Sequence, residues 1–116
     1  MRVSHKRYAR LHVVSLNRQL AEAALKALAQ LHGGTLDETG LGIRWGQYAY
    51  YSIARGLQGL QWEYDDYSAP VKFREFQRLF AREYSAAAIQ AALRAMGRQV
   101  QVARRGERVH IQGVAM

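Results

Sequence analysis

Apolar and polar positions alternate in the first regular segment of the chain and then change to a helical spacing. Between Ala9 and Val13, apolar side chains alternate with basic ones, which predicts a half-buried strand over residues 8–16. Over residues 18–31 the apolar side chains recur at the spacing of one helix face. That face consists of Leu20, Ala24, Ala27, Leu28 and Leu31.

Signals for both ends of this helix stand beside it. Either Ser15 or Asn17 can cap the first turn, because each side chain can accept a hydrogen bond from an unpaired backbone N–H. Gly33 follows the last apolar position and favours a stop. It also begins a polar, glycine-rich stretch, 33–40, which predicts a loop with at most a short strand over 35–37.

Alternation returns after the loop, in three further segments. Residues 41–45, 48–55 and 60–66 are rich in β-branched and aromatic side chains, which fit a pleated surface. Gly46 marks a bend between the first two segments. The Gly-Leu-Gln-Gly run at 56–59 predicts a turn, so we expect the last two segments to pair as a hairpin.

A long helix is predicted over residues 72–96. Its apolar side chains lie near one face: Phe76, Leu79, Phe80, Ala86, Ile89, Leu93 and Met96. Pro70 stands where the helix should begin, and Gly97 supplies a stop at its other end. Since 25 residues is long for a small domain, Ser85 can divide this segment into two helices.

The chain closes on a second predicted hairpin, with apolar residues alternating at 100 and 102, a turn at 105–107, and alternation again at 109 and 111. The predicted order is therefore β-α-β-β-β-α-β-β in a single domain, residues 1–116. Strands before and after two amphipathic helices are typical of the α+β class. We expect a two-layer sandwich in which an antiparallel or mixed sheet carries both helices on one face.

Composition excludes several classes of protein. The 116 residues are 49% apolar and 22% charged, which is typical of one globular domain. No apolar run is long enough for a membrane span, and no apolar region of a signal peptide follows the basic start. The sequence contains no cysteine, which rules out disulfides, thiolate metal sites and a cysteine nucleophile. We therefore expect a cytoplasmic protein that does not enter membranes.

The chain is strongly basic, with a net charge of +8 and a pI of about 10.3. Only three of the 17 basic residues are lysines, and arginine is the better residue for bidentate contacts with phosphate or carboxylate. A pI above about 9 is typical of nucleic-acid-binding domains. A solvated basic surface explains the same charge, so the charge alone leaves both interpretations open.

The order of elements and several short runs resemble a family of small proteins of unknown function from cyanobacteria and red-algal chloroplasts. Its members open with Ser-His, a strand and a helix ending in Ala-Leu-x-x-Leu-Gly. Here Ser4 and His5 precede the strand, and Ala-Leu-Ala-Gln-Leu occupies 27–31. The runs Trp-Glu-Tyr-Asp-Asp at 62–66 and Arg-Glu-Tyr-Ser-Ala at 82–86 follow in the family's order.

This chain departs from the family in its three extra N-terminal residues, its greater basicity and the glutamate that separates the Arg-Tyr pair. The resemblance implies the same α+β order and no established activity. It also implies an accessory or adaptor role beside an ATPase of the AAA class.

Catalytic chemistry finds no support in the sequence. The four histidines, at 5, 12, 32 and 110, lack a metal-ligand spacing. Glu63 and Asp65 lie on one side of a strand and can pair or hold Mg²⁺, although a solvated strand face that meets arginines explains them as well. No phosphate-binding loop or serine nucleophile motif is present. We expect no catalytic residue, no metal site and no cofactor.

Arginines and aromatic residues are the better candidates for function. Three arginines recur every four residues on one helix face, where the like charges need compensation, in part from Glu75 and Glu83. Two more precede the last turn, and aromatic side chains that can stack on bases crowd the middle of the chain. The candidate binding surface is Arg74, Arg78, Arg82, Arg104, Arg105, Tyr48, Tyr50 and Trp62.

Two functions remain open. The first is a non-enzymatic adaptor that binds a protein partner or a second copy of itself, with the hairpin 99–114 as a free edge. The alternative is an RNA- or DNA-binding module that uses the arginines and an aromatic strand face. Arginines that share one exposed face with the tyrosines would favour nucleic acid, whereas scattered arginines and an apolar patch would favour a protein interface.

Overall fold

The computed structural model describes residues 5–13, 15–106 and 108–115. They form seven strands and two helices in the order β-α-β-β-β-β-α-β-β. The elements are β1 Arg7–Arg10, α1 Arg18–His32, β2 Thr35–Leu36, β3 Gly42–Trp45, β4 Ala49–Gly56, β5 Gly59–Asp65, α2 Phe73–Ala95, β6 Arg98–Arg105 and β7 Arg108–Ala115.

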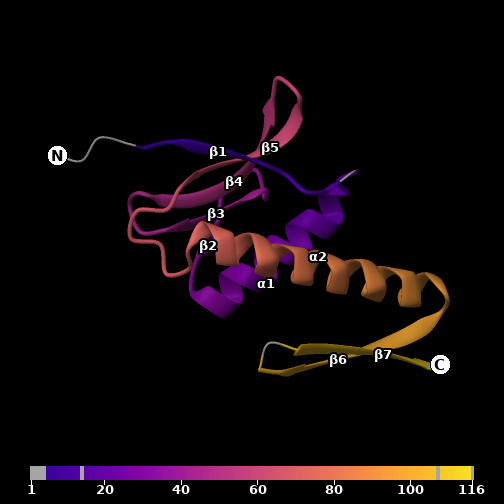
Figure 1. Ribbon diagram of the computed structural model, residues 1–116. Coiled ribbons are helices and arrows are strands. Elements are labelled where there is room, and N and C mark those ends of the chain that lie inside the picture. Colours follow the sequence, from indigo (N-terminus) through magenta and orange to yellow (C-terminus); the bar gives the residue numbers. More distant parts are fainter. Residues whose placement is uncertain (1–4, 14, 107, 116) are drawn as a thin grey trace.

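Strands β1 to β5 make one antiparallel sheet in the order β1-β5-β4-β3-β2, and both helices lie on the same face of it (Figure 1). The predicted hairpin is its centre, with β4 and β5 paired from Tyr50 opposite Asp65 to Gly56 opposite Gly59. The α+β class and the sandwich of sheet and helices are thereby confirmed. The short strand β2 lies in the stretch that was predicted as a loop with at most a short strand.

Aromatic rings join the sheet to α2. On the inner face of the sheet, Tyr51 and Trp62 are buried, and the ring of Phe76 on α2 lies 4.4 Å from that of Tyr51 and 5.4 Å from that of Trp62. The hydroxyl of Tyr51 donates a hydrogen bond to the carbonyl of Val71, just before α2. Burial raises the pKa of this hydroxyl above its usual value. This layer fixes the position of the first half of α2.

Helix α1 begins and ends at its local signals. The side chain of Asn17 accepts a hydrogen bond from the backbone N–H of Leu20, and Gly33 ends the helix with a φ of 76°. A residue with a side chain is strained in that left-handed conformation. Of the two predicted caps, Asn17 is therefore the one used.

Helix α2 is a single helix of 23 residues, so Ser85 does not divide it. It is about 34 Å long, whereas the 15 residues of α1 reach only about 22 Å. The buried residues that α2 gives to the main core end at Phe80. Further along, two residues of its predicted apolar face, Ile89 and Met96, are 50% and 67% exposed. Neither helix in the described part of the chain is long and apolar enough to cross a membrane.

The last two strands form a sheet of their own. β6 and β7 pair with each other from Arg98 opposite Ala115 to Arg105 opposite Arg108, and they lie on the side of α2 away from the five-stranded sheet (Figure 1). The sequence indicated this hairpin but not its separation from the main sheet. The molecule therefore has a third layer, which the two-layer expectation lacked.

The first strand is shorter than predicted, because β1 ends at Arg10 rather than at residue 16. Arg10 pairs with Gln61, near the beginning of β5. The chain then leaves the sheet toward α1, and Leu11, Val13 and Leu16 pack against the core from that connection. Their alternation reflects burial without strand pairing.

Candidate binding surface

The three arginines on α2 have different surroundings. Arg74 is exposed. Arg78 donates from Nε to Glu75 at 3.0 Å, and Arg82 donates from Nε to Glu83 at 3.1 Å. The two glutamates thus compensate the stripe of like charges, as predicted. A stripe that is partly compensated by glutamates of its own helix offers less charge to a polyanion.

Arg104 projects from β6 toward α2 and contacts Glu83 there. Its Nη1 lies 2.8 Å from one oxygen of Glu83, and its Nη2 donates to the other oxygen. Glu83 is only 3% exposed and holds Arg82 as well. Burial alone would raise the pKa of Glu83, but the hydrogen bonds and charges of Arg104 and Arg82 outweigh it and hold that pKa below its usual value. The same carboxylate raises the pKa of Arg104.

The aromatic candidates lie elsewhere. Trp62 is 2% exposed and belongs to the core, so its place on the predicted surface is wrong. Tyr48 is exposed in the turn between β3 and β4, against the ring of Tyr67. Tyr50 lies on the outer face of the sheet, whereas Arg104 contacts α2 on the inner side of that sheet. The predicted set does not form one surface.

The outer face of the five-stranded sheet has its own aromatic and basic residues. The strand register places Tyr8 on one side of Glu63 and Ser52 on the other. It also places Arg44 opposite Tyr50. The guanidinium of Arg44 lies 5.3 Å from the centre of the Tyr50 ring. Glu63 forms an ion pair with Lys6 and brings a carboxylate into the middle of this face. Its charge opposes the approach of phosphate groups.

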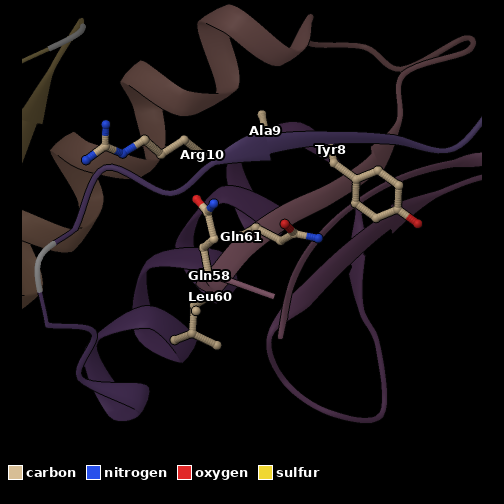
Figure 2. Close-up of a pocket in the computed structure, with 7 residues that line it drawn as sticks. Tyr8, Ala9, Arg10, Gln58, Leu60 and Gln61 are labelled. Atoms are coloured by element: carbon tan, nitrogen blue, oxygen red, sulfur yellow. The ribbon is translucent and has the colours of Figure 1, made fainter. Parts of the chain in front are cut away.

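A groove opens at the edge of the sheet, between β1 and the turn that joins β4 to β5. Its volume is about 570 Å³. Figure 2 shows Tyr8 and Arg10 on one side and Gln58, Leu60 and Gln61 on the other. The lining offers amide, phenol and guanidinium groups beside one leucine, and such groups suit contact with a ligand.

The apolar face of the β6–β7 hairpin is only partly covered. Val100, Val102, Val109 and Ile111 share the face that carries Arg104 toward α2, as their register shows. Val102 is 44% exposed, and the other three are half-buried. Together with Ile89 of α2 and Met96, the residue that caps its end, they form what we call the α2–hairpin layer. It is an apolar surface that the main core leaves partly uncovered.

A second groove runs between α2 and β7, with a volume of about 400 Å³. Ala86 and Ile89 line it from the helix, and Val109 and Ile111 line it from the strand. Arg82 and Arg108 lie along the same groove. It joins the free edge of β7 to the exposed half of α2.

Metal and acid–base chemistry gain no support from the geometry. Among the residues that the structure describes, no three histidine, aspartate or glutamate side chains gather where they could hold a metal ion. Glu63 pairs with Lys6, and buried Asp65 accepts a hydrogen bond from the backbone N–H of Tyr67. A structural role therefore accounts for both carboxylates of the predicted pair.

Compared with protein-family models, with curated proteins and with solved structures, the chain shows no significant match. Inference about its function therefore depends on the geometry. From the sequence, Glu83 was expected only to compensate neighbouring charge in part, and Ile89 and Val102 were expected as members of apolar faces rather than as exposed residues. The apolar stripe predicted on residues 72–96 is longer than helix α1. This difference in length could have indicated that one end of the stripe is exposed.

Proposed function

We propose that this chain is a non-enzymatic binding protein that holds a protein partner on the α2–hairpin layer. The observation that carries the proposal is the exposure of Ile89, Met96 and Val102 on elements that extend beyond the main core. Ile89 shares a groove with Val109 and Ile111 of β7, and an exposed apolar patch is typical of protein interaction sites. An isolated two-stranded sheet is marginal in water, so a partner that covers the hairpin would also stabilise it.

The distribution of charge supports a protein partner over nucleic acid on this side of the molecule. Arg78, Arg82 and Arg104 are engaged with carboxylates, and the tyrosines lie beyond the helices on the sheet. An ATPase of the AAA class, which the family resemblance implies, is the first partner to test. The cytoplasm is the compartment in which we expect this interaction.

The proposal is tested with the purified chain as bait in a lysate of the native cells. The variant Ile89→Gln/Val102→Thr removes apolar surface without adding charge, and Leu57→Gln changes a fully exposed leucine in the β4–β5 turn as a matched control. We expect a partner that wild type and the control retain and that the double variant loses. Equal recovery by all three baits would overturn the proposal, and sedimentation velocity of the bait alone would show whether the partner is a second copy.

Nucleic-acid binding is the second candidate, and residues on the outer face of the sheet support it. Tyr8 is 58% exposed there, and Arg44 lies over the ring of Tyr50. Exposed rings and guanidinium groups on a sheet can stack on unpaired bases. The carboxylate of Glu63 beside Tyr8 counts against it.

A further inference from the structure

Strand β7 has an edge with no strand beside it. Within the described residues its eight residues pair with β6 alone. In an antiparallel ladder, alternate residues direct their N–H and C=O groups away from the partner strand, so an edge strand presents a row of donors and acceptors. Such an edge can accept the backbone of another chain.

Helix α2 packs on the apolar face of the hairpin and leaves a groove on its β7 side. Ser85, Ala86 and Ile89 of α2 form one wall, and Arg108, Val109 and Ile111 of β7 form the other. The wall residues of α2 at the centre are small or apolar, which leaves room for alternate side chains of an added strand. Backbone hydrogen bonds would then supply affinity, and the helix wall would select side chains.

We propose that the edge of β7 takes up an extended, acidic segment of a partner protein as a third strand, which lies beside β7 and along the flank of α2. This inference rests on the proposed function, because it assigns the class of partner to part of the α2–hairpin layer. The segment alternates apolar side chains, which face Ala86 and Ile89, with acidic ones.

Charge selects an acidic occupant. Arg82 and Arg104 both contact Glu83 near this end of the groove. Arg108 lines the groove, and Arg105 stands opposite it at the end of the hairpin. Carboxylates that approach this end of the groove are attracted, most strongly at low ionic strength.

The same features disfavour two other occupants. A second copy would bring its own basic hairpin, with four arginines at 98, 104, 105 and 108, so edge-to-edge pairing would place like charges together. A DNA backbone offers phosphate acceptors but no donors for the outward carbonyl groups of β7, and an RNA backbone adds only its 2′-hydroxyl groups. A peptide backbone offers both.

The experiment selects ligands from a displayed library of random linear peptides on the full chain. Peptides retained by the Ile89→Glu variant are discarded. An enriched peptide is then synthesised in its parent form and in a form N-methylated at alternate residues, which removes strand donors but keeps every side chain and charge. Binding is measured by fluorescence anisotropy, with Leu57→Glu as the control for an added charge far from the groove.

We expect acidic peptides with alternating apolar residues, and binding that weakens about tenfold or more on N-methylation, the loss expected from a few backbone hydrogen bonds. Binding should weaken similarly in Ile89→Glu but not in Leu57→Glu, and the parent peptide should slow hydrogen exchange of β7 amides. Equal binding of both peptide forms, or no enrichment over Ile89→Glu, would overturn strand addition. If the bait experiment nevertheless shows a partner lost in Ile89→Gln/Val102→Thr, the layer binds protein in another way and only this inference fails.

Discussion

Glu83 on α2 accepts hydrogen bonds from both terminal nitrogens of Arg104 on β6, 21 residues further along the chain. The carboxylate is nearly inaccessible, whereas the side chain of Arg104 is about one-third exposed. This pair connects the hairpin to the helix at the end opposite the short β6 connection. It therefore sets the angle at which the apolar face of the hairpin meets α2.

Replacing Glu83 with Gln should loosen the hairpin. The substitution leaves Arg82 and Arg104 without their shared carboxylate, and losing one partner of a buried pair costs about 1–3 kcal/mol when the other partners can reach water. Urea unfolding should show this loss, and the β6 and β7 amides should exchange faster while β4 amides change little. The matched variant Glu75→Gln, which removes an exposed i,i+3 partner of Arg78, should leave stability unchanged. Equal effects in both variants would contradict the role assigned to Glu83.

The same pair predicts a pH dependence at acidic pH. Because Arg104 and Arg82 hold the pKa of Glu83 below its usual value despite burial, its contribution is complete above the unfolded-state pKa of about 4.3. That contribution is lost as the pH falls through the lower folded-state pKa. The difference in unfolding free energy between wild type and Glu83→Gln should therefore shrink between about pH 5 and pH 2. A difference that stays constant over this range would show that protonation of Glu83 does not matter.

Phe76 should be among the most sensitive positions in the core. Its ring contacts those of Trp45, Tyr51 and Trp62, and its side chain is fully buried. Phe76→Ala should lower the free energy of unfolding by about 3–5 kcal/mol, through lost transfer energy and the cavity left behind. Tyr8→Ala, on the exposed outer face, serves as the control and should change thermal stability little. A small effect of Phe76→Ala would mean that α2 does not depend on this aromatic layer.

Labelled single-stranded RNA and duplex DNA should show no binding that persists at about 200 mM salt. Phosphate-driven binding weakens steeply as the salt concentration rises from about 50 to 200 mM. Fluorescence anisotropy at both concentrations measures this. Arg74→Ala tests the exposed member of the helix stripe, and Tyr8→Ala/Arg44→Ala tests the outer face of the sheet. Salt-resistant binding that the second variant abolishes would make nucleic acid the leading function.

Local signals were sufficient for several elements. The helix expected over 18–31 is α1. Asn17 begins it through a side-chain hydrogen bond, and Gly33 ends it through its left-handed backbone conformation. The hairpin of β4 and β5 follows from alternation on both sides of a glycine-bounded turn. In each case the cause lies within a few residues of the effect. The α+β class could be predicted because it depends on the order of such elements.

The covering of each apolar face depended on tertiary structure. Alternation at 100, 102, 109 and 111 indicates an apolar face, but only the position of α2 shows that this face lies outside the main sheet and is half covered. Trp62 and Tyr48 are both aromatic residues of the middle segment, yet one is buried under α2 and the other is exposed in a turn. Periodicity sets which side chains share a face, whereas burial and ion pairing depend on what packs against that face. Glu83 is decisive for this reason: its partner Arg104 meets it only after α2 and the hairpin have come together.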